Sequence, residues 1–453
     1  MTDYSSWGYP LTESQSAIRP VWRPVEIETS AQNSDSSTVL AFGNGRSYGD
    51  SCMNRPGAVI DCRSMNRFIS FNSSSGQLTL ECGVLFNDII NAFLPKGWFL
   101  PVTPGTRFIT VGGAIANDVH GKNHHRRGSF GQYITELKLL RSNGELLTCS
   151  GSENSRLFNA TIGGLGLTGL ITSATIQLVP VESTSMDTVT LPFNSLDEFL
   201  SLSQQYDKTH EYSVAWLDCL NTSSTGFSGL LYCANHAAAA STDTHEISSF
   251  QLQPPRMNIP FNLPSITLNR LSVSMFNRLY YWSGKRKAGE SRQSLQSFFY
   301  PLDGLNNWNR IYGSKGFYQY QFTVPLSAKD TFQTILNTLA TEASPSFLTV
   351  LKLFGNSESP GLLSFPKQGL CLALDLNNRG EKTLQMLDKL DQLVISVGGS
   401  VYPAKDRRMS GEAFRSFFPR HEEFSQHIDP VFCSDFWRRV NANEKDSADS
   451  SYE

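Results

Sequence analysis

Three glycine-rich segments in the first 172 residues limit the fold of this chain more than any other feature of the sequence. They are "AFGNGRSYGDSC" at 41–52, "PVTPGTRFITVGGAIANDVHGKNHHRRGSFG" at 101–131 and "FNATIGGLGLTGLIT" at 158–172. Turns alone do not require so many glycines, whereas a backbone without side chains can approach a phosphate or a flat ring closely. We therefore expect a large cofactor to lie extended across this region, with its pyrophosphate on backbone amides.

The first segment does not match the dinucleotide fingerprint G-x-G-x-x-G. Its glycines are Gly43, Gly45 and Gly49, so the third comes one position too late, and no helix pattern follows it. The stretch 50–61 predicts a loop and then a short strand. By itself the segment fits an ordinary tight turn equally well, so the predicted phosphate site depends on the other two segments.

Residues 37–182 predict an α+β unit, because short β-rich runs alternate with glycine-rich loops. One helix is expected near 86–94, where the apolar residues recur with helical period before Pro95 and Gly97 end the pattern; they are Phe86, Ile89, Ile90, Phe93 and Leu94.

After about residue 183 the pattern changes to longer helices between longer strands, which predicts an antiparallel sheet backed by helices. Ser195 and Glu198 have the spacing of a capping box at the start of a helix, and the strand-like 211–220 follows that helix. Two further helices are expected near 330–342 and 382–397.

Three predicted strands of this region carry polar residues at alternating positions. Gln319, Gln321 and Thr323 share one face of "GFYQYQFTVP", Lys352 lies among apolar neighbours in "FLTVLKLFG", and Cys371, Ala373 and Asp375 share a face of "GLCLALDL". This face is either the solvent-exposed side of a sheet or the wall of a substrate cavity that holds hydroxyl groups. The pattern alone fits both.

The segment 250–300 mixes prolines and large apolar residues with the basic run Lys285-Arg286-Lys287, and it shows no clean helix or strand period. Such a segment predicts a long covering loop. An apolar loop with a basic flank also suits contact with a lipid tail or a membrane surface, which we keep as an alternative.

Composition and charge exclude several classes of partner. The net charge of −3 and the lack of long charge runs argue against nucleic-acid binding. No apolar run reaches the roughly 18–20 residues that span a bilayer, and the N-terminus lacks a signal-peptide pattern, so we expect a cytoplasmic protein. The polar tail 441–453 is expected to be frayed.

We expect neither disulfides nor a metal site. The eight cysteines are scattered without C-x-x-C spacing, which fits reduced thiols. His120, His124 and His125 have no carboxylate at a zinc-site spacing, and loop histidines are more often hydrogen-bonded structural groups.

Taken together, "GNGRSYGD", "PGTRFITVGGAIANDVHGKNHH", "GSFG", "GGLGLTGLI", "WNRIYGSKGFYQYQF", "LKLFG" and "VYPAKDRR" resemble the decaprenylphosphoryl-β-D-ribose 2′-oxidase family, flavoenzymes of the vanillyl-alcohol-oxidase fold. The resemblance extends from about residue 40 to about residue 440. It implies an α+β fold with an FAD-binding domain formed by 1–182 and 400–453. The substrate domain, 183–399, is inserted between these parts and built on the antiparallel sheet.

The resemblance also implies how FAD is held. The loop at 43–49 is similar to the family's pyrophosphate loop, in which many members of the wider fold attach flavin through a histidine. Gly45-Arg46-Ser47 offers no imidazole there, so non-covalent FAD is expected. The implied cofactor positions are Gly43, Asn44, Gly45, Arg46, Ser47, Tyr48, Gly49, Pro104, Gly105, Thr106, Val111, Gly112, Gly113, Ala114, Asn117, His120, Gly121, Asn123, Gly166, Gly169, Ile171 and Tyr402.

The implied reaction is oxidation of a sugar secondary hydroxyl, at C2′ of a polyprenylphosphoryl-β-D-ribofuranose. Hydride passes from C2′–H to flavin N5, and the hydroxyl proton passes to a base or water. Matching positions give Lys405, Tyr402, His120 and Lys352 as catalytic residues and Gln319, Gln321, Lys352, Ala373 and Lys405 as substrate-binding residues.

Two of these positions have alternatives. Spacing alone would favour Lys405 as a surface lysine next to Asp406, but the surrounding motif favours the active site, where its charge would stabilise the transition state. Ala373 stands where mycobacterial members carry a cysteine, and Cys371 lies two residues away on the same strand face.

The implied partners are a lipid-linked or small sugar substrate, an NAD(P)H-dependent keto-sugar reductase that completes epimerisation to arabinose, and quinone or O2 as electron acceptor. Contact with the inner face of the membrane is a further expectation. The alternatives are a soluble polyol, aldonolactone or nucleoside oxidase that uses O2, and a flavin-carrying scaffold that has lost turnover.

Overall fold

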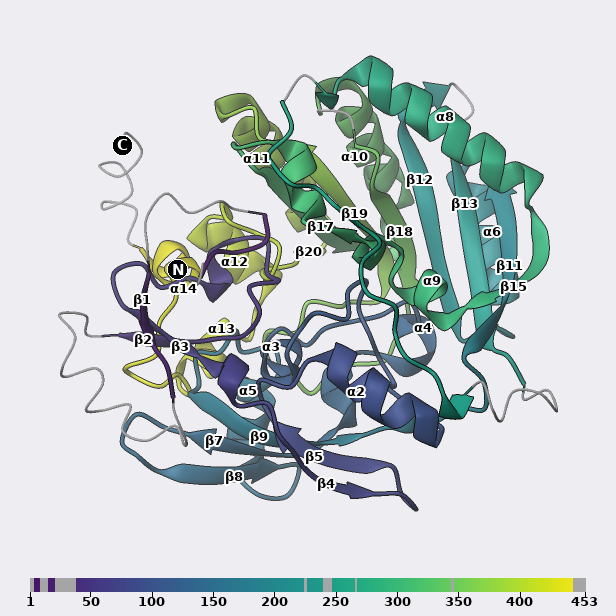
Figure 1. The fold of residues 1–453 in the computed structure, drawn as a ribbon. Coiled ribbons are helices and arrows are strands. Elements are labelled where there is room, and N and C mark those ends of the chain that lie inside the picture. Colours follow the sequence, from purple (N-terminus) through teal and green to yellow (C-terminus); the bar gives the residue numbers. More distant parts are fainter. Residues whose placement is uncertain are drawn as a thin grey trace.

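The computed structural model describes residues 4–8, 15–20, 38–223, 226–238, 247–264, 267–343 and 346–442. The tail that we expect to be frayed lies outside these residues from 443 onward. Figure 1 shows the five-stranded and three-stranded sheets at the bottom and left, and a large twisted sheet with its helices at the upper right. No helix in the described ranges has the length and apolar character needed to cross a bilayer.

The first part of the chain builds a parallel sheet and an antiparallel sheet. The three-stranded parallel sheet has the order β1 (Ser16–Ile18), β3 (Ala58–Asp61), β2 (Val39–Phe42). The five-stranded antiparallel sheet has the order β4 (Phe68–Asn72), β5 (Gln77–Glu81), β9 (Leu170–Gln177), β7 (Ile134–Leu140), β8 (Leu146–Ser150). A small antiparallel pair joins β6 (Trp98–Phe99) to β10 (Val179–Pro180).

Short helices connect these strands. The predicted helix near 86–94 is confirmed as α2 (Phe86–Phe93), which buries Phe86, Ile89, Ile90 and Phe93 as its apolar period requires. The others are α3 (Val111–Ala116), α4 (His124–Arg127) and α5 (Ser155–Thr161). After Gly49 there is only a 3-10 turn, Asp50–Cys52, before β3, as predicted for a loop followed by a strand.

The second part builds an eight-stranded sheet in which every pair is antiparallel. Its order is β15 (Gly289–Ser294), β11 (Ser185–Phe193), β13 (Gly226–His236), β12 (Tyr212–Ser223), β18 (Thr349–Phe354), β19 (Gly369–Asn377), β17 (Phe317–Val324), β20 (Ser400–Val401).

Three predicted helices cover one face of this sheet and are confirmed: α6 (Leu196–Tyr206), α10 (Lys329–Glu342) and α11 (Glu381–Ser396). Ser195 caps α6 by accepting from the backbone N–H of Glu198 at 3.1 Å. Phe332 of α10 and Leu390 of α11 share a buried core with Phe322 of β17. The sheet is therefore backed by these helices on one face, and part of its other face borders a cavity.

The prediction of a covering loop over 250–300 is wrong, because α8 (Arg270–Arg286) occupies the middle of that segment. It begins at Asn269, whose side chain accepts from the backbone N–H groups of Leu271 and Ser272. The same segment adds β14 (Met257–Asn258) and α9 (Leu295–Phe299), and β14 pairs with β16 (Leu305–Asn306).

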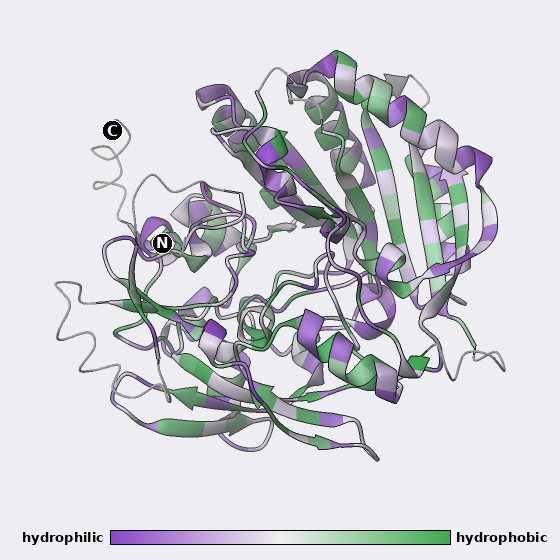
Figure 2. Ribbon diagram, viewed as in Figure 1, coloured by the Kyte–Doolittle hydropathy of each residue, from purple (hydrophilic) through white to green (hydrophobic). Residues whose placement is uncertain are grey.

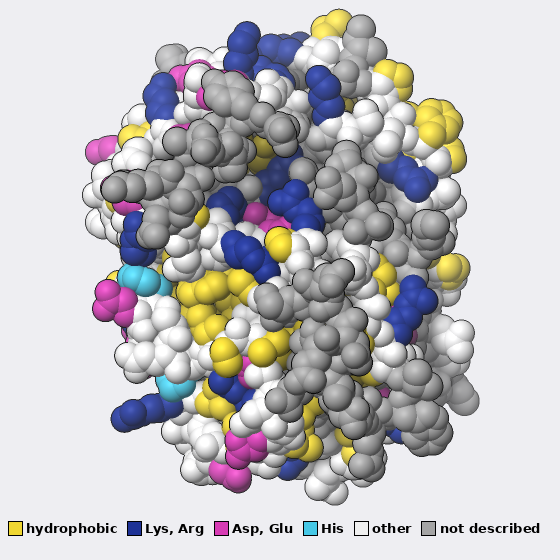
Figure 3. Space-filling model, turned by 90° about the vertical axis from the view of Figure 1, so that its left-hand side faces the viewer, with side chains coloured by type: hydrophobic (Ala, Val, Ile, Leu, Met, Phe, Trp, Pro, Cys, Tyr) yellow, Lys and Arg dark blue, Asp and Glu magenta, His cyan; other side chains and the backbone are white. Residues whose placement is uncertain are grey.

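The chain then returns to its first part through α12 (Gly411–Phe417), α13 (His421–Ser425) and α14 (Asp435–Asn441). Val39 of β2 forms a parallel bridge with Phe432, and Arg439 of α14 pairs with Asp50 at 2.8 Å. The face of the molecule shown in Figure 3, which is the left-hand side of Figure 1, has hydrophobic side chains near its middle with Lys and Arg side chains gathered above them.

Candidate active site

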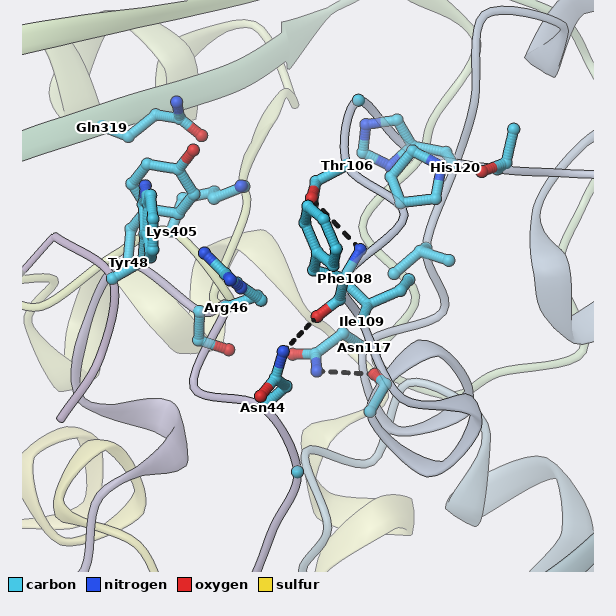
Figure 4. A pocket seen from close by; sticks show the side chains of 18 of the residues that line it. Asn44, Arg46, Tyr48, Thr106, Phe108, Ile109, Asn117, His120, Gln319 and Lys405 are labelled. Carbon is cyan, nitrogen blue, oxygen red and sulfur yellow. Dashed lines mark hydrogen bonds between the residues drawn. The ribbon is translucent and has the colours of Figure 1, made fainter. Parts of the chain in front are cut away.

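A cavity of about 430 Å³ lies between the glycine-rich loops and the face of the eight-stranded sheet opposite α6, α10 and α11. Its lining comes from loop 43–48, segment 103–122, strands β17 to β19 and segment 402–405. Figure 4 shows Gln319, Tyr48 and Lys405 together on one side of this pocket and Thr106 and His120 on the other. Residues from well-separated parts of the sequence thus surround one space.

Most of the predicted site residues line this cavity. They are Gly43, Asn44, Gly45, Arg46, Ser47, Tyr48, Pro104, Gly105, Thr106, Gly112, Gly113, Asn117, His120, Gly121, Gly166, Gly169, Ile171, Gln319, Gln321, Lys352, Ala373, Tyr402 and Lys405.

Four predicted cofactor residues lie behind the lining. Val111 and Ala114 are buried in α3, and Asn123 donates from Nδ2 to the carbonyl oxygen of Pro101 at 2.9 Å. Gly49 packs so closely against the backbone of Asp406 that a Cβ would lie 1.6 Å from its carbonyl oxygen. These four residues shape the loops that carry the lining.

The first glycine loop follows β2 directly and is fixed at both ends. Asn44 donates from Nδ2 to the carbonyl oxygen of Phe108 at 2.7 Å, and the N–H of Tyr48 donates to the carbonyl oxygen of Ala404 at 2.9 Å. Gly45 has a φ of +59°, and a Cβ there would lie 2.5 Å from the carbonyl oxygen of Ser5. Glycine is therefore required by both backbone conformation and space.

The second glycine segment forms α3, and its helix start is held by a cap. The Thr110 side chain accepts from the N–H of Gly113 at 3.1 Å, while the N–H of Gly112 donates to the carbonyl oxygen of Cys82 at 2.8 Å. Asn117 at the end of α3 donates to the carbonyl oxygen of Gly113 at 2.8 Å, and its buried Oδ1 has no partner in the described residues.

Arg46 brings a half-buried cation to the glycine loop. Its guanidinium carbon lies 4.0 Å from the ring centre of Trp7, and its Nε is buried without a hydrogen-bond partner among the residues that the structure describes. Burial lowers the pKa of Arg46, and the nearby carboxylate of Asp303 opposes that shift. A half-buried cation with a buried, unused donor beside open backbone suits an anionic group.

His120 is a neutral imidazole in an aromatic setting. Burial, reinforced by the positive charges of Lys352 and Lys405, holds the pKa of His120 well below its usual 6.5. Gln321 Nε2 donates to His120 Nε2 at 2.8 Å, which places the imidazole proton on Nδ1. The His120 ring lies 5.3 Å from the ring of Tyr402, whose hydroxyl donates to the carbonyl oxygen of Asn117 at 2.8 Å.

Lys405 is half-buried in the cavity wall. Its Nζ lies 3.7 Å from the ring centre of Tyr48, and burial lowers the pKa of Lys405 to about 7, although the nearby Asp375 carboxylate opposes the shift. Burial raises the pKa of Asp375 to about 7, in spite of hydrogen bonds from Gln319 Nε2 at 2.6 Å and the Tyr312 hydroxyl at 3.1 Å. Lys405 therefore lies in the cavity wall and not at the surface.

Two more lysines face the same space. Burial lowers the pKa of Lys352, and burial together with the charge of Lys352 lowers the pKa of Lys122 to about 7. Lys122, Lys352 and Lys405 bring amino groups that can carry positive charge to one cavity. The cavity is therefore suited to a ligand that carries negative charge.

The polar sheet face belongs to the cavity and not to bulk solvent. Gln319 pairs in register with Asp375, and Gln321 pairs with Ala373, so these side chains lie in adjacent rows on the cavity side of β17 and β19. Lys352 on β18 is opposite Cys371. Amides, a carboxyl and an ammonium in one wall provide donors and acceptors for several hydroxyl groups.

Several lining residues were not predicted from the sequence, namely Trp7, Phe108, Lys122, Trp216, Tyr280, Asp303 and Trp308. Lys122 follows directly after Gly121, which was predicted as a site residue, so its position in the sequence indicates that it lies near the site. Asp303 accepts from the N–H of Arg107 at 2.8 Å, a contact between residues 196 positions apart that no local pattern indicates. Within the described ranges no three His, Cys, Asp or Glu side chains gather as a metal site would need, and all eight cysteines are free thiols.

Comparison with known proteins identifies the glycine-rich region. Residues 29–150 match a family model described as an FAD binding domain. The chain is 38% identical over 435 residues to decaprenylphosphoryl-beta-D-ribose oxidase of Mycolicibacterium smegmatis, which covers 92% of each chain. It is 30% identical over 173 residues to L-gulonolactone oxidase of Bos taurus, covering 37% of this chain and 39% of the relative.

The cavity fits FAD. Gly105 and Gly166 leave their surroundings open, since a Cβ at Gly105 would meet nothing within 4 Å and one at Gly166 would meet only Leu40 at 3.7 Å. The unused donor of Arg46 suits a pyrophosphate, and the unused Oδ1 of Asn117 offers an acceptor to a polar ring edge. The donor set and the open backbone therefore agree with the cofactor that the matched family binds.

Proposed function

Because the chain belongs to the family of decaprenylphosphoryl-β-D-ribose oxidase, a group of FAD-dependent oxidoreductases that act on sugar hydroxyls, we propose that it oxidises C2′ of a polyprenylphosphoryl-β-D-ribofuranose to the 2′-keto sugar. The observation that carries this substrate is the cavity wall in which Gln319, Gln321, Lys352 and Lys405 face the glycine loops. A pentose has hydroxyls for the amides, and its phosphate has charge for the lysines.

FAD is held without a covalent link in this proposal. Loop 43–48 would receive the pyrophosphate on its backbone, with Arg46 as the nearby cation, and Gly112 and Gly113 of α3 would lie against the flavin without side chains in the way. When bound, FAD supplies the acceptor for the hydride that leaves C2′. Purified protein is expected to be yellow and to release all its flavin on acid precipitation; flavin retained in the denatured pellet would contradict the non-covalent assignment.

The chain's own residues handle charge and the proton. Oxidation removes a hydride from C2′ and a proton from its hydroxyl, so a base must face that hydroxyl. His120 is neutral, and its Nε2, which accepts from Gln321, is the nitrogen that can take the proton, while Lys405 and Lys352 stabilise the negative charge that develops on the oxygen. Tyr402 positions the end of α3 through its bond to Asn117.

The fold in this proposal is that of the vanillyl-alcohol-oxidase type. Residues 1–182 and 400–453 form the FAD-binding domain, and 183–399 form the inserted substrate domain. The return of α14 to the region of β2 and Asp50 supports this division.

An NAD(P)H-dependent reductase then converts the keto sugar to the arabinose epimer, and quinone or O2 reoxidises the flavin. We place the protein on the cytoplasmic side, which cell fractionation with compartment markers tests. Mixing the reductase with the oxidation product and following NAD(P)H consumption tests the partner.

The deciding experiment is anaerobic bleaching of the flavin by different sugars. A prenyl-phospho-ribose should reduce the flavin much faster than ribose or ribose 5-phosphate, because only the first carries both the furanose and a lipid phosphodiester. Equal or faster reduction by a free polyol, an aldonolactone or a nucleoside would replace this substrate with a soluble one.

A further inference from the structure

Helix α8 exposes large apolar side chains on the side that faces away from the molecule. Leu271, Met275, Leu279 and Trp282 are 81%, 61%, 59% and 56% exposed, and their spacing places them along one stripe of the helix. We call these four residues the outer face of α8. Figure 1 shows α8 at the edge of the molecule over β12 and β13, and Figure 2 shows hydrophobic and hydrophilic turns alternating along it.

The outer face is not the side of α8 that packs on the core, because the opposite side of the helix is already packed against the sheet. Val273 and Asn277 are buried, and Asn277 Nδ2 donates to the Asp218 carboxylate at 2.7 Å. Gly284 sits so close to Leu230 of β13 that a Cβ would lie 2.2 Å from it. Apolar residues that stay exposed on a well-seated helix indicate an interaction surface.

The charges around this face have one sign. Between residues 270 and 287 the sequence has five basic residues and no Asp or Glu, in a chain whose net charge is −3; they are Arg270, Arg278, Lys285, Arg286 and Lys287. The guanidinium carbon of Arg286 lies 4.5 Å from the ring centre of Trp282. Basic side chains around a Trp- and Leu-bearing stripe are typical of a helix that lies in an anionic membrane interface.

The apolar surface continues from α8 to the cavity. Tyr280 of α8 lines the cavity, and its ring lies 4.8 Å from that of Trp216, another lining residue. On the adjoining strand β14, Met257 is 65% exposed, and β14 pairs with β16, whose Leu305 and Asn306 also line the cavity. A lipid chain at the outer face would thus have an apolar path to the cavity.

We propose that the outer face of α8 inserts into the surface of an anionic lipid bilayer, with the neighbouring Lys and Arg side chains on the lipid phosphates. A second copy of this chain would bring like-charged helices together, which opposes self-association through this face. The path from the bilayer to the sugar rests on the proposed function, whereas binding to the bilayer does not require turnover.

The test is flotation of the full-length, FAD-loaded protein with vesicles, measured without substrate. Vesicles of phosphatidylcholine and phosphatidylglycerol in equal parts are compared with vesicles of phosphatidylcholine alone. The wild type should float with the anionic vesicles, more weakly at high salt, and little with the neutral ones. The double variant Leu279→Ser/Trp282→Ser should bind the anionic vesicles about tenfold or more weakly.

The matched control is Leu146→Ser, because Leu146 on β8 is 57% exposed and far from α8 in sequence and sheet. It should float like the wild type. Replacing Lys285, Arg286 and Lys287 by Ser should weaken anionic-vesicle binding about a hundredfold. Bound flavin absorbance verifies that each variant is folded.

Three results would overturn the proposal: wild-type protein that stays unbound with anionic vesicles, Leu279→Ser/Trp282→Ser protein that floats like the wild type, or a wild-type dimer that this double variant converts to monomer. Equal flotation with both kinds of vesicle would contradict the proposed contact between the basic residues and anionic lipid phosphates. If the protein binds vesicles but prenyl-phospho-ribose does not bleach its flavin, the membrane surface on α8 is supported and the proposed substrate is rejected.

Discussion

At the scale of single residues, Lys405 is the side chain that we propose to stabilise negative charge in the transition state. It is half-buried in the cavity wall near Tyr48, Asp375 and Lys352, so its charge acts where less water screens it than at the surface. Lys405→Met should keep bound FAD and slow anaerobic flavin reduction about a hundredfold to a thousandfold, as measured by stopped-flow absorbance. The control Lys315→Met removes an exposed lysine and should reduce at the wild-type rate. A Lys405→Met enzyme of undiminished rate would move the role to Lys352 or His120.

The pH dependence follows from the same side chain. Burial lowers the pKa of Lys405 to about 7, so its ammonium is present below that pH and lost above it. If the charge stabilises the transition state, the rate of flavin reduction falls as pH rises through about 7. Lys405→Arg keeps a charge at all these pH values and should lack this decline, while remaining slower than the wild type because a planar fork replaces a compact ammonium. A wild-type rate that instead rises through pH 7 would make neutral Lys405 the proton acceptor.

At the scale of elements, the sequence predicts what local chemistry determines. Helices α2, α6, α10 and α11 follow from a single apolar stripe or a cap, and each buries that stripe. Helix α8 was missed because its apolar and aromatic residues lie on several sides of the helix, so no single stripe stands out in the sequence. The signals for α8 that remain are the cap at Asn269 and the helical spacing of Leu271, Met275, Leu279 and Trp282.

The first glycine loop is the element on which cofactor binding should depend most. At Gly45 an alanine would need the left-handed conformation, which costs about 1–2 kcal/mol, and would also meet the Ser5 carbonyl. Gly45→Ala should therefore weaken FAD binding by about tenfold or more, measured by fluorescence titration of apoprotein. Gly144→Ala is the control, since Gly144 has a φ of +84° in a turn with open space around it. Equal loss of FAD affinity in both variants would show a general effect on stability.

At the scale of the whole molecule, a buried ionic network joins segments that are far apart in the chain. Arg408 binds both carboxylate oxygens of Asp391 on α11 at 2.6 and 2.7 Å, and Arg439 on α14 bonds to Asp50 and to Asp406. The network thus links the end of the first glycine loop, the Lys405 segment and the helix-covered side of the eight-stranded sheet. No periodicity or spacing reveals such pairs, because their members are brought together only by the completed fold.

Breaking this network should loosen the molecule as a unit. Arg408→Met leaves Asp391 and Asp406 buried without their shared cation, which is expected to cost about 3–5 kcal/mol of unfolding free energy. Urea titrations followed by tryptophan and by flavin fluorescence should both shift to lower urea, because the network touches the cofactor segment and the sheet alike. Arg420→Met, which removes an exposed pair with Glu423, should leave both transitions in place. If Arg408→Met shifted only the tryptophan transition, the carboxylates would be stabilising the sheet alone, and the C-terminal segment would hold the cofactor region without them.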